Sequence, residues 1–185
     1  MTHDDLARRS RLMATLTKAL IIGMLVLNTA FWLLPEFARQ YDLGFNLTAI
    51  GLSADLNVDL GSMPWWQIAG GLFLSSIPLL ILANGLISLL RLFQLYSEGQ
   101  YFVDKSATLL GKVGFAVILW VILSFVLTPA MSIWMTLLQP PGQGFLTIAF
   151  NASDFLSLFL AASLMVVARI HQKGSALAQE NKQFI

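Results

Sequence analysis

The run WWQIAGGLFLSSIPLLILANGLISLL at residues 65–90 contains no charged side chain, and it decides the fold of this chain. The hydrocarbon core of a bilayer is about 30 Å thick, so a helix of roughly 20 mostly apolar residues crosses it. Three further runs meet this requirement, at about 13–34, 113–138 and 150–169. We therefore expect an all-α integral membrane protein whose four transmembrane helices form a single up-down bundle.

The composition of the whole chain agrees with a membrane location. Of the 185 residues, 57% are hydrophobic and 11% are charged, and the mean hydropathy is +0.73. Soluble domains usually carry about 25% charged residues. The formal net charge of +1 argues against direct nucleic-acid binding. Because the chain has no cysteine, disulfides, thiolate metal sites, iron–sulfur clusters and dithiol relays are excluded.

The distribution of basic residues predicts the orientation of the spans, because Lys and Arg gather in the cytoplasmic loops of membrane proteins. Of the Lys and Arg residues, only Arg39 falls on the outer side, where it lies beside acidic residues. We therefore expect both termini and residues 91–112 in the cytoplasm. The basic residues on that side are Arg8, Arg9, Arg11, Lys18, Arg91, Lys105, Lys112, Arg169, Lys173 and Lys182.

A cleaved signal peptide is the alternative interpretation of the first span, since a basic segment precedes it. However, the apolar run is long and ends in Phe31-Trp32-Leu33-Leu34, without a small-x-small cleavage site. We expect a retained transmembrane helix.

The outer loop at residues 35–64 is longer than a simple connection between two helices. Apolar and polar side chains alternate within it at 45–50 and at 52–60, on either side of Gly51. Alternation of this kind is typical of β-strands, so we expect a small β-hairpin. We interpret its row of aspartates as a solvated face, with a cation site as the alternative.

Between the second and third spans, the helical spacing of apolar residues continues beyond the basic boundary, across residues 91–112. Ser97-Glu98-Gly99-Gln100 has the composition of a turn in which Gly99 adopts the left-handed conformation that ends many helices. Asp104 or Ser106 can cap the next helix. We therefore expect a cytoplasmic helical hairpin. Its candidate partner surface consists of Phe93, Tyr96, Gly99, Tyr101 and Phe102.

Residues 91–102, RLFQLYSEGQYF, followed by Leu109, Leu110, Gly111 and Gly114, resemble the bacterial domain-of-unknown-function family 2975 (DUF2975). The chain is similar to that family in its four spans, its outer loop and a G-x-x-F turn before the third span. The resemblance implies a bacterial inner-membrane location and no established catalytic residues. Some members of the family look like partners of small helix-turn-helix regulators, which would imply a protein-binding surface on the cytoplasmic side.

Polar residues within the spans form a second candidate site. Small polar groups mediate contacts between helices in lipid, and a ligand or ion path along a polar seam is the alternative. For Asp154, the acidic residue of this set, two positions in the membrane remain possible. A last helix that begins near Asn151 makes it a cap at the outer interface, which we favour, whereas a start near Phe145 places it inside the membrane. The candidate seam consists of Asn28, Asn84, Ser124, Thr128 and Asp154.

Three further patterns predict how the helices pack. Pro78 and Pro129 lie inside the second and third spans and should kink them. Tryptophans near the outer boundary predict an aromatic belt, formed by Trp32, Trp65, Trp66 and Trp134. Small-xxx-small pairs allow close approach of helices, within the chain or in a homo-oligomer, and these pairs are Ala19/Gly23, Ala107/Gly111 and Ser157/Ala161.

Residues that carry chemistry are scarce. His3 and His171 are the only histidines, and both are predicted to be cytoplasmic. This excludes a bis-histidine haem and a Ser–His dyad within the bilayer, and no phosphate-binding Gly-rich loop with a lysine is present. We therefore expect neither an enzyme nor a cofactor. The predicted function is a partner-binding sensor or regulatory membrane protein in contact with lipids; the alternative is a small transporter, channel or lipid-binding module that uses the polar seam.

Overall fold

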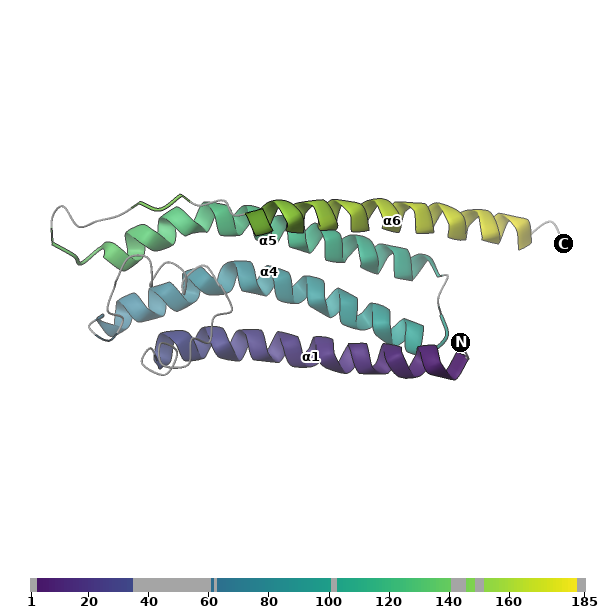
Figure 1. The fold of residues 1–185 in the computed structure, drawn as a ribbon, viewed down its shortest axis with the longest axis horizontal. Coiled ribbons are helices and arrows are strands. Elements are labelled where there is room, and N and C mark those ends of the chain that lie inside the picture. Colours follow the sequence, from purple (N-terminus) through teal and green to yellow (C-terminus); the bar gives the residue numbers. More distant parts are fainter. Residues whose placement is uncertain are drawn as a thin grey trace. The chain divides into compact units, whose positions relative to one another are not determined.

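Four long helices make up the part of the chain that the structure describes. The computed structural model describes residues 3–34, 61, 63–100, 103–140, 146–148 and 152–182. The helices are α1 (His3–Leu33), α4 (Trp65–Ser97), α5 (Asp104–Thr136) and α6 (Ala152–Lys182), shown in Figure 1. Each contains a stretch that is long and apolar enough to cross a membrane. The protein is therefore a multi-pass membrane protein, as the sequence predicts.

The helices extend beyond the predicted apolar spans. α1 begins at His3, ahead of the apolar span that starts near Met13, and α5 begins at Asp104, where the predicted helical hairpin places the start of this helix. α4 and α5 have 33 residues each, which corresponds to about 50 Å at 1.5 Å per residue, against a hydrocarbon core of about 30 Å. The span prediction counts apolar residues, whereas the hydrogen bonding of a helix continues through the polar residues that follow them.

The predicted β-hairpin is not borne out. The described ranges of the chain contain no strand, and residues 45–60, which were to form the hairpin, lie outside them. Alternation of apolar and polar residues is a weak signal for such a short element. A two-stranded hairpin is marginal in water unless further strands or a helix support it.

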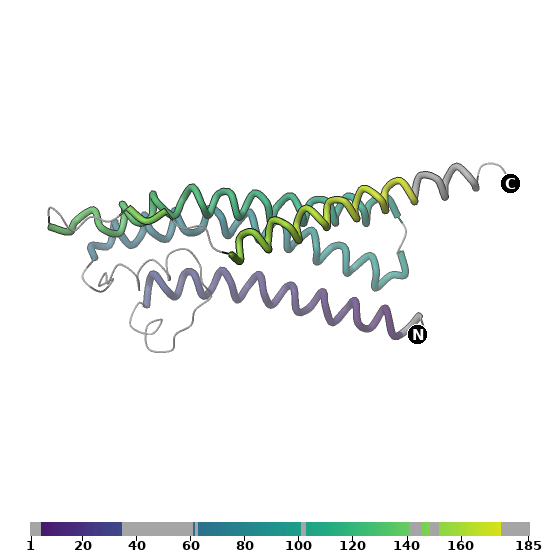
Figure 2. Tube along the Cα trace, turned by 45° about the horizontal axis from the view of Figure 1, so that its top comes forward, coloured from purple at the N-terminus to yellow at the C-terminus, as the bar shows by residue number. Residues whose placement is uncertain are grey.

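The chain divides into two compact units, and each unit contains pieces of several helices. Unit 1 consists of residues 1–21, 81–119 and 152–185, and unit 2 consists of residues 22–80 and 120–151. The course of the backbone through the helices can be followed in Figure 2.

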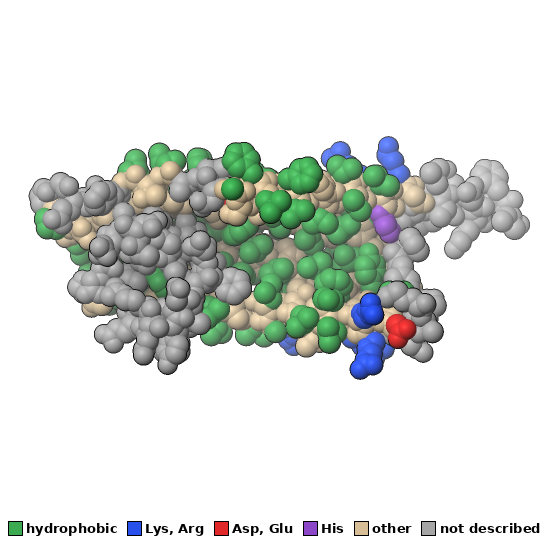
Figure 3. Space-filling model, viewed as in Figure 1, with side chains coloured by type: hydrophobic (Ala, Val, Ile, Leu, Met, Phe, Trp, Pro, Cys, Tyr) green, Lys and Arg blue, Asp and Glu red, His purple; other side chains and the backbone are tan. Residues whose placement is uncertain are grey.

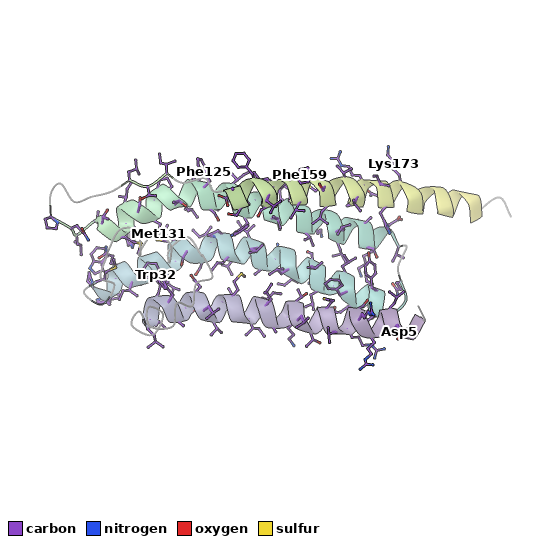
Figure 4. The ribbon with its side chains drawn as sticks, viewed as in Figure 1. Asp5, Trp32, Phe125, Met131, Phe159 and Lys173 are labelled. Atoms are coloured by element: carbon purple, nitrogen blue, oxygen red, sulfur yellow. The ribbon has the colours of Figure 1, made fainter. Side chains whose placement is uncertain are left out.

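Unit 2 has a core to which α1, α4 and α5 contribute. Ile68, Leu72 and Leu74 of α4 lie against a cluster formed by Phe31, Trp32, Met131 and Met135. Figure 4 labels two members of this cluster, Trp32 on α1 and Met131 on α5. The rings of Phe31 and Trp32 meet edge to face, with their centroids 5.6 Å apart, an arrangement that aromatic pairs favour.

Unit 1 is held together by small residues that allow helices to approach closely. A Cβ placed on Gly85 of α4 would meet the Cβ of Ala116 on α5 at 2.5 Å, and one placed on Gly114 of α5 would lie 2.8 Å from the backbone oxygen of Ala161 on α6. A Cβ on Gly111 would be 3.8 Å from Ala168. Two predicted small-xxx-small positions, Gly111 and Ala161, therefore do lie at helix contacts, as expected for membrane helices.

Apolar side chains cover the surface of the helices. They dominate the face drawn in Figure 3, on which the Lys and Arg side chains lie towards the N-terminal end of α1 and along α6. Phe159 of α6 is 68% exposed. In water such a surface would drive aggregation, whereas lipid tails solvate it.

Candidate functional site

The turn between α4 and α5 has a well-defined hydrogen-bonded geometry. Gly99 has φ 79°, its N–H donates to the Tyr96 carbonyl at 3.2 Å, and the Gln100 N–H donates to the Leu95 carbonyl at 3.1 Å. This pair of bonds is a Schellman motif, which satisfies the free carbonyls at a helix C-terminus. The predicted left-handed conformation of Gly99 is confirmed.

The start of α5 differs from the prediction that Asp104 or Ser106 caps it. The Ser106 N–H donates to the Val103 carbonyl at 2.9 Å, so Val103 occupies the N-cap position, and Asp104 is the first residue of the helix. Ser106 is 1% exposed, and its hydroxyl is 3.5 Å from the Gln100 carbonyl, to which it donates. The serine thus joins the helix to the turn, and the aspartate lies where a helix N-terminus favours a negative charge.

Side chains around this turn divide into buried and accessible ones. Leu92, Ala107 and Leu109 are buried, whereas Arg91 and Lys105 are exposed. Of the predicted partner surface, Phe93 and Tyr96 are half-buried and Gly99 is exposed, while Tyr101 and Phe102 lie outside the described residues. The described part of the predicted surface is therefore accessible at one end of the α4–α5 pair.

A hydrogen-bonded network joins α1 to α4 within unit 2. The Asn28 amide donates to Ser76 Oγ at 3.3 Å, and the Trp32 indole N–H donates to Ser75 Oγ at 3.0 Å. Both serine hydroxyls in turn donate to the carbonyl of Leu72, at 3.1 Å from Ser75 and 2.6 Å from Ser76. Asn28 and Trp32, which lie one turn apart on α1, are therefore both linked through a serine hydroxyl to the Leu72 carbonyl of α4.

A second polar contact joins α4 to α5. Gln67 is 1% exposed, and its side-chain amide donates to the carbonyls of Trp134 at 2.7 Å and Met135 at 3.4 Å. These carbonyls belong to the last turn of α5, where they have no partner within the helix. In return, the Trp134 indole N–H donates to the Gln67 carbonyl at 2.9 Å. The contact satisfies backbone groups that lipid cannot satisfy.

Two adjacent glycines of α4 make room for two tryptophans. A Cβ on Gly71 would overlap the ring of Trp32 from α1, and a Cβ on Gly70 would overlap the ring of Trp134 from α5. Trp32 is 2% exposed, whereas Trp65 is 80% exposed. The predicted aromatic belt is thus wrong for Trp32, because its ring packs on a glycine instead of facing the lipid.

The five residues of the candidate polar seam belong to different units: Asn28, Ser124 and Thr128 lie in unit 2, and Asn84 and Asp154 lie in unit 1. Asn28 is paired with Ser76, and the Thr128 hydroxyl donates to the Ser124 carbonyl at 2.7 Å. The hydroxyl of Ser124 is buried and has no hydrogen-bond partner among the described residues. Asn84 is exposed on the surface of α4. Asp154 lies in the first turn of α6, which begins at Ala152, so the helix start agrees with the capping interpretation.

Sequence reasoning missed the contacts made by Gln67, Gly70 and Gly71. The signal was present in WWQIAGG, where a glutamine and two glycines follow the tryptophans. The residues that contact Gln67, Gly70 and Gly71 lie on α1 and α5, far away in the sequence, so the sequence of α4 alone does not identify them. In the ranges that the structure describes, no group of three or more His, Cys, Asp or Glu residues could hold a metal ion.

Comparisons with known proteins give one match. The model of a family described as a protein of unknown function, DUF2975, matches residues 13–185. No curated protein and no solved structure matches the chain.

Proposed function

This chain belongs to the DUF2975 family, and we propose that it is a non-enzymatic membrane protein of the bacterial inner membrane that senses or regulates by holding a protein partner at the turn between α4 and α5. The turn and both termini lie in the cytoplasm in this proposal, because the basic residues gather there.

The main support for the proposal is the distance by which α4 and the turn extend beyond the predicted membrane boundary at Arg91. Arg91 is exposed, and an arginine at the end of a membrane span places its charge at the headgroup level. α4 continues for six residues beyond Arg91, to Ser97, which corresponds to about 9 Å of helix at 1.5 Å per residue. A loop that only connected two spans would not need this extension. The extra turns of α4 and α5 therefore present side chains in the water beyond the headgroups.

The surface also has the character of a binding site. The Schellman bonds at Gly99 and the contact from Ser106 to Gln100 order the turn before any partner arrives, which lowers the entropic cost of binding. Phe93 and Tyr96 are half-buried aromatic residues at its edge, and aromatic residues are enriched at protein interfaces. A small helix-turn-helix regulator, the partner implied by the family resemblance, is one class of protein that could dock there.

The transport alternative receives less support from the contacts. Asn28 and Thr128 use their polar groups in short local bonds, and Asn84 is exposed on the surface of its helix. A permeation path would need polar groups that remain available to the permeant.

The test is site-specific photo-crosslinking in intact cells. A photoreactive phenylalanine analogue replaces Phe93 in one variant and Phe73, which is 69% exposed on α4, in the matched control. We expect one discrete protein adduct from position 93 and none from position 73. The substitution Tyr96→Asp should abolish the adduct, and the thermal midpoint of the purified variant checks that it remains folded. Adducts with lipid alone at position 93, or the same protein adduct at both positions, would contradict the proposal.

A further inference from the structure

One polar side chain faces outward from an apolar part of α4. Asn84 is exposed, and its side-chain amide makes no hydrogen bond with any group in the described part of the chain. Its backbone carbonyl is bound by the Ser88 hydroxyl at 3.2 Å. The other asparagine in a described span, Asn28, is 3% exposed and donates to Ser76. Among the described residues, the amide of Asn28 thus has a partner and the amide of Asn84 has none.

The position of Asn84 along α4 places its amide in the hydrocarbon. It lies seven residues before Arg91 and eighteen after Trp66, which corresponds to about 10 Å and about 27 Å of helix at 1.5 Å per residue. With these two residues at opposite headgroup levels, the short Asn side chain cannot reach either interface. A lipid tail offers no hydrogen bond, so an unpaired amide at this depth is unfavourable.

The residues around Asn84 make this face suitable for close packing with another helix. Leu80 and Ile87, at one turn on either side along the same face, are 58% and 36% exposed. Gly85, which is next in sequence, faces α5, where it approaches Ala116. Asn84 lies about 100° around the helix from Gly85 and is exposed, so its face differs from the one that contacts α5.

We propose that this face of α4 is the contact between two copies of the chain, in which the amide of Asn84 exchanges hydrogen bonds with Asn84 of the partner subunit. A carboxamide is both a donor and an acceptor, so it is complementary to itself. A two-fold axis places the same residue of each protomer opposite its equivalent, and two identical chains carry the amide at the same depth in the membrane. A single buried asparagine also sets the register of paired helices.

The absence of cysteine allows a direct test in native membranes. A single cysteine is introduced by Ile87→Cys, next to the proposed contact, or by Phe115→Cys as a control, since Phe115 of α5 is 59% exposed. After mild oxidation we expect a disulfide-linked dimer from Ile87→Cys and none from Phe115→Cys. Adding Asn84→Leu to Ile87→Cys should lower the dimer yield at least tenfold, whereas Asn84→Gln, which keeps an amide, should retain a substantial part of it.

Within one protomer the Asn84 side chain is exposed, and Asn84→Leu replaces it by an apolar side chain of similar size, so the substitution should not impair folding of the protomer. Sedimentation equilibrium in detergent gives a second measurement: the wild-type chain should sediment as a dimer and the Asn84→Leu variant as a monomer. Equal cross-linking at positions 87 and 115, or a dimer that Asn84→Leu leaves unchanged, would overturn the proposal. An Ile87→Cys adduct with a different protein would overturn it as well. None of these results depends on a partner at the α4–α5 turn.

Discussion

The indole N–H of Trp32 donates a hydrogen bond to the hydroxyl of Ser75 at 3.0 Å, and the two residues connect α1 to α4 within unit 2. Trp32 is 2% exposed, so the bond is shielded from water. In lipid, hydrogen bonds and close van der Waals packing replace the hydrophobic effect as the forces that hold helices together. The contact therefore belongs to the interactions that define how these two helices pair.

Replacing Ser75 by alanine tests the strength of this bond. Ser75→Ala leaves the Trp32 indole N–H without its acceptor and should lower the free energy of unfolding by about 0.5–2 kcal/mol. The measurement is the thermal unfolding midpoint in detergent. Ser163→Ala is the matched control, because the Ser163 hydroxyl is exposed and bonds only to the Phe159 carbonyl of its own helix. Equal midpoints for the two variants would contradict the assignment.

Adding a methyl group at Gly71 tests the packing of the same tryptophan. Because a Cβ there would overlap the Trp32 ring, Gly71→Ala should destabilise the protein by about 1–3 kcal/mol. Gly23→Ala is the control, since a Cβ at Gly23 has no atom within 4 Å, and we expect it to be neutral or slightly stabilising. Trp32→Phe, which shortens the ring, should recover part of the stability lost in Gly71→Ala. Additive effects of the two substitutions would argue against the contact.

Removing the side-chain amide of Gln67 should loosen the end of α5. Gln67→Leu leaves the carbonyls of Trp134 and Met135 without the donor that they have in the structure, at a cost of about 1–3 kcal/mol. We expect hydrogen exchange to become faster in the last turn of α5, while exchange in the first turn of this helix stays unchanged. If exchange in the last turn of α5 is equally fast in the wild-type protein and in Gln67→Leu, Gln67 does not stabilise the C-terminus of α5.

The turn between α4 and α5 should depend on glycine at one position. Gly99 has φ 79°, a conformation that costs residues with a Cβ about 1–2 kcal/mol. Gly99→Ala should therefore reduce stability and weaken cross-linking from position 93, whereas Gly99→Asn should be milder, because asparagine tolerates this conformation better. Gly174→Ala on α6 is the control, since a Cβ there has no atom within 4 Å. Equal stability of the Gly99 and Gly174 variants would contradict this prediction.

The orientation of the chain can be measured with reporter tags at both termini. Because the basic residues gather on one side of the predicted spans, we expect a cytoplasmic reporter such as a fluorescent protein to be active at either end. A periplasmic reporter should be active only when it is inserted between α1 and α4. Activity of the periplasmic reporter at one terminus would show that the number of spans is not even.

The number and the position of the helices could be predicted from the sequence alone. Spanning a bilayer needs a minimum length of apolar chain, and that length can be read from residues 65–90 without any tertiary contact. The turn at Gly99 was equally predictable, because its signal lies within a few consecutive residues. The β-hairpin is not borne out, and its residues lie outside the described ranges. The N-cap of α5 was not predicted correctly, since capping propensity is a weak signal where packing can override it.

Local composition thus determined that the described part of the chain has four helices long and apolar enough to span a membrane, and a structured turn. Hydrophobic length and backbone geometry are properties of neighbouring residues. Only the tertiary structure decided that Trp32 is buried while Trp65 is exposed, and that Asn28 is paired while Asn84 faces outward. Each pair consists of identical residues in apolar helices. What separates them is the face that each helix turns towards its neighbours, and that depends on contacts such as Gly71 with Trp32, which join residues far apart in the chain.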